Sequence, residues 1–477
     1  MTLFSQFFNL QKTQAELDFV NVPINRDIPL FIDPFALSQR PDRWSQQASG
    51  TLVAFFEKVV RAIRENDVAL ALQLLQHLRE PNETRFGLSK KRPRGAGIGQ
   101  FQSQQLLDVL RSSSAVRTGF LNALEDCELL VEGIGRDKIS DLTTNIIRGH
   151  LAEYSKAQCD LLSIQTQSIS LGPYYSPSSG EWVSEYFDLP VARSKPVLLV
   201  PKVIARFDPA YDHQKYYRQI VLSYLQAEHL AANSSLVRIL KNRRRVVYKK
   251  DIEATFPCTK ENLFEFSKTH PEALGKYRER LTELEKSSRG SVVEPEDEQL
   301  IAEALAEALS SIRPGSAEAT TYHHLIIGIV EFLFFPDLLC PRKEREIHQG
   351  RKRIDIVMEN GAQRGIFWNL HQIRHLPCSF VVFECKNYVT DIANPELDQI
   401  SSRFSTNRGQ VGILCCRSFQ NRALFIERCR DTFGDGRGLV IPLDDETINR
   451  CLQLLADGRR KELNEEFTRL VDEVWLA

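Results

Sequence analysis

Two charged side chains stand at the end of a strongly apolar run, Phe380 to Asn387, which reads Phe-Val-Val-Phe-Glu-Cys-Lys-Asn. Such a run predicts a buried strand, in which Glu384 and Lys386 share one face while Cys385 points to the other. A carboxylate can hold a divalent cation, and a nearby ammonium can orient water or bind a phosphate. The alternative for an isolated Glu-x-Lys is an ion pair at the rim of a sheet.

Two further carboxylates occupy apolar surroundings upstream of this strand. Glu331 lies near the end of a segment at 320–336 that is apolar nearly all round and therefore predicts a buried helix. An ionised carboxylate there needs a cation, a metal or a strong hydrogen-bond donor, because a buried unpaired charge is costly. Asp355 alternates with isoleucines in a strand predicted at 353–358.

The segments around these acids predict a mixed sheet covered by helices. From residue 318 to 458 the order is helix, three strands, helix, strand, helix, strand and helix, and helical connections between apolar strands are typical of such sheets. We expect strands at 346–351, 353–358, 380–387, 410–416 and 438–443, an inserted helix at 366–376, and a closing helix at 446–457.

The helix that follows the charged strand should face it. It is predicted to begin with Asn394 as cap and Pro395 in the first turn. Gln399 and Arg403 lie one turn apart beside its apolar stripe. Both side chains could therefore reach the strand that carries Lys386.

The rest of the chain is predicted to be mainly helical. Helices are expected at 50–64, 67–79, 101–112 and 141–162, the last capped by Ser140, and an interrupted strand at 197–205. A polar stretch rich in Ser, Gly and Pro then indicates a domain boundary. We therefore expect an α+β or α/β protein with a mainly helical N-terminal domain at 1–285, a linker and connecting helix at 286–317, and the sheet domain at 318–477.

Two basic clusters lie outside the sheet domain. The first consists of Lys90, Lys91, Arg92 and Arg94, directly before a glycine-rich stretch, and the second of Lys241, Arg243, Arg244, Arg245, Lys249 and Lys250. Such cations can follow phosphates, and each neutralised phosphate steepens the salt dependence of binding. A solvated surface is the alternative for both clusters. The first cluster lacks the Gly-Lys-Ser/Thr ending of a P-loop, which excludes an ATPase.

Composition favours an ordinary soluble protein of more than one domain, since 477 residues exceed what one hydrophobic core usually serves. The ten cysteines form no Cys-x-x-Cys pair, which argues against structural zinc and disulfides and fits a reducing compartment. No apolar run is long enough to span a membrane, and the first residues lack the features of a secretory signal. We therefore expect a cytoplasmic protein without a membrane partner.

The order of the acids and their elements resembles the PD-(D/E)XK restriction-endonuclease-like superfamily over about residues 318–458. Helix Glu331, strand Asp355, strand Glu384-x-Lys386 and helix Gln399 follow its pattern, and Phe383-Glu-Cys-Lys-Asn-Tyr is similar to the same strand of methyl-directed (Mrr-type) restriction endonucleases. Two residues depart from it, because Ile354 stands at the proline of the signature and Arg403 at a position where members can have tyrosine.

The resemblance implies a restriction-endonuclease-like fold with a central mixed sheet flanked by helices, and hydrolysis of phosphodiester bonds with Mg²⁺ or Mn²⁺. Asp355 and Glu384 would be the metal ligands, with the Cys385 carbonyl as another and Glu331 completing the shell directly or through water. On this view Glu384 belongs with the other acids around a metal rather than in an ion pair with Lys386.

Lys386 would orient the attacking water or bind the phosphate, and Gln399 corresponds to the helix glutamine of these enzymes. The substrate implied is nucleic acid, DNA before RNA, and the role is a bacterial restriction or anti-phage effector, with a homodimer or higher homo-oligomer expected by analogy. The alternative is an inactive nucleic-acid-binding or scaffold protein that keeps the nuclease fold.

Overall fold

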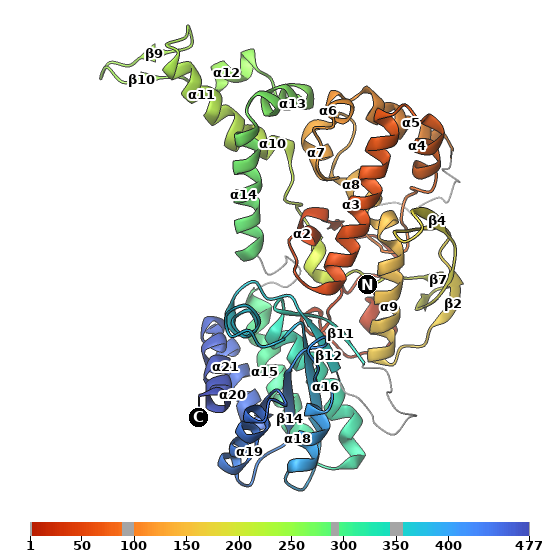
Figure 1. Ribbon diagram of the computed structural model, residues 1–477, viewed down its shortest axis with the longest axis vertical. Coiled ribbons are helices and arrows are strands. Elements are labelled where there is room, and N and C mark those ends of the chain that lie inside the picture. Colours follow the sequence, from red (N-terminus) through yellow and green to blue (C-terminus); the bar gives the residue numbers. More distant parts are fainter. Residues whose placement is uncertain (1, 88–99, 288–294, 344–355, 477) are drawn as a thin grey trace.

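The computed structural model describes residues 2–87, 100–287, 295–343 and 356–476, and its apolar side chains gather in two cores. The first core draws mainly on residues between Phe4 and Leu281, and the second on residues between Ala302 and Val474 together with Ala15 and Leu161. Figure 1 shows the second region, with its sheet, below the helices of the first. The two regions meet along a seam, where the first core also includes Leu339 and Cys340.

The first region is mainly helical, as expected. Its longer helices include α3 (Arg43–Arg64), α4 (Val68–Leu75), α5 (Gln100–Ser112), α11 (Leu222–Ala231), α13 (Lys260–Thr269) and α14 (Pro271–Ser287). The shorter ones are α1 (Phe4–Phe7), α2 (Pro34–Ser38), α6 (Ser114–Thr118), α7 (Asp126–Leu130), α10 (His213–Tyr216) and α12 (Lys249–Thr255). The predicted helices at 50–64, 67–79 and 101–112 are confirmed as α3, α4 and α5. Helix α3 begins earlier than predicted because Asp42 caps it, accepting a hydrogen bond from the Ser45 amide at 2.9 Å.

The single helix predicted at 141–162 is wrong in its start and its continuity. The structure has α8 (Arg136–Ile146) and α9 (Arg148–Leu162), separated at Ile147. Ser140 is a buried residue inside α8, and its hydroxyl accepts a hydrogen bond from the Ile32 amide at 2.9 Å. The serine therefore serves a neighbouring strand rather than the start of its own helix.

Small two-stranded ribbons cover part of the first region, and the sequence did not predict them. They pair β1 (Phe31–Ile32) with β8 (Ala205–Arg206), β2 (Gln167–Ser170) with β5 (Tyr186–Leu189), β3 (Tyr174–Ser176) with β4 (Glu181–Val183), β6 (Val191–Ala192) with β7 (Lys195–Pro196), and β9 (Arg238–Ile239) with β10 (Arg245–Val246). The strand predicted at 197–205 is instead mostly irregular. Its apolar side chains are buried, but the Leu198 amide bonds to the Glu83 carbonyl and the Leu199 amide to the Ser155 hydroxyl, and strand pairing is confined to a single bridge at Pro201 and to Ala205 in β8.

A mixed sheet of five strands organises the described part of the second region. In spatial order these are β11 (Leu338–Arg342), β12 (Ile356–Asn360), β13 (Phe380–Lys386), β14 (Val411–Cys416) and β15 (Leu439–Asp444). The pairs β11–β12 and β12–β13 are antiparallel, and β13–β14 and β14–β15 are parallel. The predicted mixed sheet is therefore confirmed, but its first strand is β11, whereas the strand predicted at 346–351 lies outside the described residues.

Helices pack around this sheet. They are α15 (Pro295–Ser311), α16 (Ala319–Phe334), α17 (Gly365–Trp368) with the π-turn η5 (Asn369–Ile373), α18 (Asn394–Ser401), α19 (Arg422–Gly434), α20 (Asp445–Ala456) and α21 (Arg460–Trp475). Helix α16 packs on β11 and β13, and α18 packs on β13, β14 and β15. Helix α15, which the sequence placed in the linker, packs against α16 and α20. These contacts bring α18 against the end of β13.

Candidate active site

The carboxylate and the ammonium predicted to share a face lie together at the end of β13. Lys386 Nζ is 2.7 Å from Glu384 Oε1, and the two side chains are 11% and 1% exposed. Cys385, between them, packs as a half-buried side chain against the second core. The alternation predicted for this strand is thus confirmed. The two charges do form an ion pair, contrary to the expectation that Glu384 would be kept apart from Lys386.

Helix α18 and the turn that follows it place two more side chains on this pair. Gln399 Nε2 donates to Glu384 Oε1 at 2.7 Å, and Gln399 Oε1 accepts from Lys386 Nζ at 3.1 Å. Arg403, one turn later and also buried, donates through Nη1 to Glu384 Oε2. The prediction that Gln399 and Arg403 face the strand is confirmed. Both oxygens of the carboxylate therefore accept hydrogen bonds from nitrogen donors.

His323, on the second turn of α16, belongs to the electrostatic surroundings of Glu384. Burial, together with the positive charge of Lys343, lowers the pKa of His323 to about 4, and Glu384 opposes the shift. The imidazole is therefore neutral near pH 7. Sequence reasoning did not single out this histidine, although its place in the first turns of a buried helix near the predicted acids was a signal.

The cluster lies where the parallel strands end. Lys386 is opposite Cys416 and Cys416 is opposite Asp444, so the carboxyl ends of β13, β14 and β15 meet at one edge of the sheet. Ligands of α/β proteins bind preferentially at such edges. This edge is also where Arg417 and Asp445 directly follow their strands.

Arg417 and Asp445 form a second polar group at this edge. Arg417 Nε is 2.9 Å from Asp445 Oδ2, and the guanidinium lies over the Tyr322 ring at 4.9 Å. The Tyr322 hydroxyl donates to Asp445 Oδ1 at 3.2 Å. Burial raises the pKa of Asp445 to about 6, although Arg417 and Tyr322 oppose the shift. Sequence reasoning missed these three residues, and the polar side chains directly after two apolar strands were the available signal.

Glu331 has a different partner from the one predicted. Its Oε1 lies 2.9 Å from Lys202 Nζ of the first region, and both side chains are at least 98% buried. The same ammonium lies 4.1 Å from the centre of the Phe335 ring. His323 and Glu331 are eight residues apart, or roughly 12 Å along the helix. The buried carboxylate has therefore found a cation at the seam, and it does not complete the Glu384 cluster.

Several predicted site residues lie outside the described residues. They are Asp355 and the whole first basic cluster, Lys90, Lys91, Arg92 and Arg94. In the chain, Asp355 directly precedes Ile356, the first residue of β12, and Ile356 pairs with Phe383, which directly precedes Glu384.

The second basic cluster lies on the β9–β10 hairpin and the start of α12, which Figure 1 shows extending from the end of α11. All six cations are exposed. Arg245 donates to the Leu230 carbonyl and Asn233, and Lys249 donates to the Arg218 carbonyl and Ser223. Across the described chain, the other four side chains, those of Lys241, Arg243, Arg244 and Lys250, have no hydrogen-bond or ion-pair partner.

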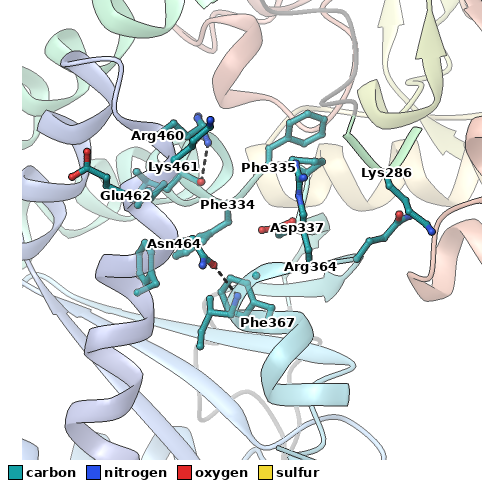
Figure 2. A pocket seen from close by; sticks show the side chains of 18 of the residues that line it. Lys286, Phe334, Phe335, Asp337, Arg364, Phe367, Arg460, Lys461, Glu462 and Asn464 are labelled. Atoms are coloured by element: carbon teal, nitrogen blue, oxygen red, sulfur yellow. Dashed lines mark hydrogen bonds between the residues drawn. The ribbon is translucent and has the colours of Figure 1, made fainter. Parts of the chain in front are cut away.

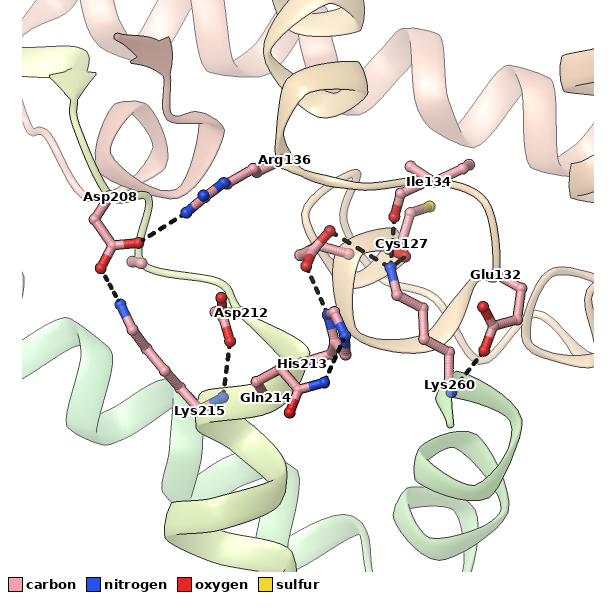
Figure 3. Close-up of polar contacts among 12 residues, drawn as sticks. Cys127, Glu132, Ile134, Arg136, Asp208, Asp212, His213, Gln214, Lys215 and Lys260 are labelled. Carbon is pink, nitrogen blue, oxygen red and sulfur yellow. Dashed lines mark hydrogen bonds and ion pairs between the residues drawn. The ribbon is translucent and has the colours of Figure 1, made fainter. Parts of the chain in front are cut away.

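A further polar cluster holds α7, α10 and α13 together, as Figure 3 shows. His213 Nδ1 lies 2.9 Å from Glu128 Oε1, while Lys260 Nζ donates to Glu128 at 3.4 Å and to the Ile134 carbonyl at 2.5 Å. Burial lowers the pKa of Lys260, and Glu128 opposes the shift. The Lys260 ammonium and the Glu128 carboxylate thus compensate each other. These contacts indicate that the cluster stabilises the packing of the three helices.

Metal-ligand clusters and membrane-spanning helices are both absent from the described residues. No group of three or more His, Cys, Asp or Glu side chains within them is arranged to hold a metal ion. None of the helices in the described ranges combines the length and the apolar character that crossing a membrane requires.

Similarity to a known protein family was found in the first region. A family model described as a domain of unknown function (DUF8370) matches residues 9–212. No curated protein and no solved structure matches the chain. The matched segment ends at the start of α10, so the sheet and the Glu384 cluster lie beyond it.

Proposed function

We propose that this chain is a metal-dependent endonuclease that hydrolyses phosphodiester bonds, with DNA as the first candidate substrate. The observation that carries the proposal is the joining of Glu384, Lys386 and Gln399 by contacts of 2.7–3.1 Å where the parallel strands end. The order α16, three strands, α18, β14 is the order that the PD-(D/E)XK resemblance implies, so it supports a restriction-endonuclease-like fold for this region.

The oxygen donors at this edge suit a hard divalent cation. The Glu384 carboxylate and the Cys385 carbonyl supply oxygen ligands of the kind Mg²⁺ and Mn²⁺ prefer, and we include Asp355 from its place directly before β12. Because three nitrogen donors already contact the two Glu384 oxygens, a cation would compete with them for the carboxylate. When bound, it would stabilise negative charge on the phosphate and lower the pKa of a water molecule. Glu331 is left out of this ligand set.

The other residues have separate roles. Lys386 is 11% exposed, so its ammonium can reach a phosphate or orient the attacking water from the mouth of the site. Gln399 contacts both functional groups and acts as a positioning residue. The exposed cations of the hairpin would bind the backbone of the nucleic acid. A restriction or anti-phage role follows by analogy with the superfamily.

The test is a cleavage assay with purified protein on DNA and RNA, each single- and double-stranded, with Mg²⁺ or Mn²⁺. We expect cutting of DNA that EDTA stops and that Asp355→Ala and Lys386→Ala each reduce at least a hundredfold. Lys276→Ala, which removes an exposed lysine of α14, is the control and should cut at the normal rate. Equal cutting by all three variants would remove the site assignment.

A nucleic-acid-binding or scaffold protein without turnover is the second candidate. The observation that favours it is that Glu384 pairs with both Lys386 and Arg403, as a purely structural ion-pair cluster would. This candidate predicts DNA binding without cleavage under every metal condition, together with an unchanged melting temperature when Mn²⁺ is added.

A further inference from the structure

A cleft of about 930 Å³ lies at the seam between the two regions, away from the Glu384 cluster. Its walls are the end of α16, the loop between β12 and α17, and the start of α21, with Arg40 and Lys286 contributed by the first region. Figure 2 shows Lys286 across the cleft from Arg460 and Lys461. A cleft of this volume is at the upper end of the range for small-molecule sites.

The cleft is positively charged. Six of its lining residues are basic and two are acidic. Arg459 pairs with Glu462, and Arg460 pairs with Glu298. Arg364 and Lys461 are exposed at the cleft, and neither side chain has an ion-pair or hydrogen-bond partner within the residues that the structure describes. Two positive charges are thus available to a ligand.

Arg40 adds a buried cation to the wall. The residue is only 4% exposed, and its Nη2 donates to the Pro336 carbonyl at 2.6 Å and the Gly361 carbonyl at 3.1 Å. Its Nε is buried without a hydrogen-bond partner, and the nearest carboxylate oxygen, that of Asp42, is 3.9 Å from it. Burial lowers the pKa of Arg40, although the negative charges of Asp42, Glu285 and Asp337 oppose the shift. These carboxylates therefore offset only part of the cost of the buried charge, and a nearby anion would offset more of it.

The start of α21 adds positive charge to the cleft wall. Arg459, Arg460 and Lys461 surround the N-terminus of this 16-residue helix, whose cap position is Arg459, a residue without a side-chain acceptor for the first helical amides. Helix N-termini carry partial positive charge. Glu462 and Glu298 pair with Arg459 and Arg460, but Lys461 has no such partner among the described residues, so a bound anion would be favourable there. The start of α21 is therefore positively charged, and so is Arg40, which belongs to a different segment of the chain.

Part of the cleft is apolar. Phe334, Phe335, Phe367 and Phe467 contribute to its lining. The Phe334 ring packs 5.3 Å from Phe367 and 4.6 Å from Phe467, centre to centre, and these three are 2–5% exposed, so the half-buried Phe335 presents the most accessible ring. Figure 2 shows Phe334, Phe335 and Phe367 on the same site as Arg364 and Lys461. A ligand that fits both parts carries phosphate groups and a flat apolar ring.

The cleft is separate from the proposed catalytic edge. Strand β12 begins at Ile356, opposite Phe383 and beside Glu384, and ends at Asn360, which leads into Gly361 of the cleft wall. The two sites therefore lie at opposite ends of this strand.

We propose that this seam cleft binds a small phosphorylated molecule of nucleotide or dinucleotide size, with its phosphates at Arg40, Arg364 and Lys461 and its ring against the phenylalanines. Because the wall includes residues of both regions, bound ligand stabilises one arrangement of the seam. The cleft is an effector site, and its ligand binding does not depend on whether the Glu384 cluster is catalytic.

The test is isothermal titration of the full-length chain, in EDTA, with ATP, GTP and the dinucleotide pApA, and with adenosine as the uncharged probe. We expect at least one phosphorylated probe to bind and adenosine not to bind. The double variant Arg364→Glu/Lys461→Glu changes only exposed side chains and should weaken that binding at least tenfold. Lys268→Glu/Lys276→Glu, the same double charge reversal on exposed lysines of α13 and α14, should leave it unchanged.

Two results would overturn the proposal. One is the absence of binding by all three phosphorylated probes at millimolar concentration, and the other is equal affinity in the wild type and the double variant. Lys386→Ala is titrated in parallel, because loss of its cleavage with retained nucleotide binding separates the cleft from the catalytic proposal. A nuclease-negative wild type that still binds nucleotide would refute only the proposed function.

Discussion

The Gln399 amide donates to the Glu384 carboxylate over 2.7 Å. Its other end accepts from Lys386 at 3.1 Å, so one neutral side chain fixes the positions of both charged groups. An amide suits this task, because it has a donor and an acceptor and adds no charge. The arrangement assigns Gln399 a positioning role that a simple rim ion pair would not need.

Replacing Gln399 with leucine should therefore reduce catalysis more than folding. We expect the cleavage rate constant to fall about ten- to a hundredfold, as for other residues that orient a metal site, with little change in KM. The pH profile of the rate should also shift, because Lys386 loses an acceptor. Gln453→Leu on α20 is the matched control. A normal rate and pH profile in Gln399→Leu would contradict the positioning role.

Arg403 should compete with a metal for Glu384. Its Nη1 donates to Glu384 Oε2, and the arginine is 8% exposed. Arg403→Met should strengthen Mn²⁺ binding, measured by calorimetry, and should lower the free energy of unfolding by about 2 kcal/mol, since Lys386 still compensates the carboxylate. Arg428→Met, the same change on α19, serves as control. Unaltered Mn²⁺ affinity would show that Arg403 does not compete.

Lys202 and Glu331 should stabilise the seam only when both residues are present. Lys202→Met leaves a buried carboxylate without its cation and should lower the free energy of unfolding by about 3–5 kcal/mol. The double variant Lys202→Met/Glu331→Leu should recover part of this loss in chemical denaturation. A double variant no more stable than Lys202→Met would mean that the charge is compensated elsewhere.

Glu125 should make stability fall as pH rises. Burial, together with the negative charge of Asp126, raises the pKa of Glu125 to about 8 from 4.5. The folded state then binds more protons than the unfolded state between about pH 4.5 and 8, so this contribution is complete below pH 4.5 and lost towards pH 8. Glu125→Gln should flatten the pH dependence of the unfolding free energy in this window. An identical slope in the variant would contradict the shift.

The hairpin should contribute salt-dependent binding. In EDTA, Arg243→Glu/Arg244→Glu should weaken DNA binding at all sequences and reduce the slope of log K against log salt by up to about 0.9 for each phosphate that is no longer neutralised. Lys268→Glu/Lys276→Glu carries the same charge change on α13 and α14. If both double variants weaken binding equally, the effect comes from net charge and the hairpin has no special role.

The sequence predicted the elements that carry strong local patterns. The apolar run before Glu384 specifies β13 by itself. The apolar stripe of α18, which continues to Phe404 in the following turn, directs the side chains of Gln399 and Arg403 towards this strand. Strand β11 was missed because Pro341 interrupts its short apolar run, which is tolerated only at a sheet edge. Helix α21 was missed although Leu463, Phe467 and Leu470 recur at helical spacing.

The partner of Glu331 could not be predicted from local pattern. The sequence places Glu331 in an apolar helix, and burying a carboxylate there costs free energy. This cost correctly predicted a compensating group. Lys202, which supplies the compensation, belongs to the other region and is brought close only by the seam. The same holds for the cleft, whose cations come from segments far apart in the chain. Long-range pairing of this kind is set by tertiary packing.

The central claim is most directly tested by plasmid cleavage with Mn²⁺, comparing the wild type with Lys386→Ala at equal, folded concentration. Cleavage by the wild type, lost on adding EDTA and reduced at least a hundredfold in Lys386→Ala, is the result that the proposed site predicts. Cleavage at the same rate by Lys386→Ala, or none by the wild type on any nucleic acid tested with either metal, would contradict it.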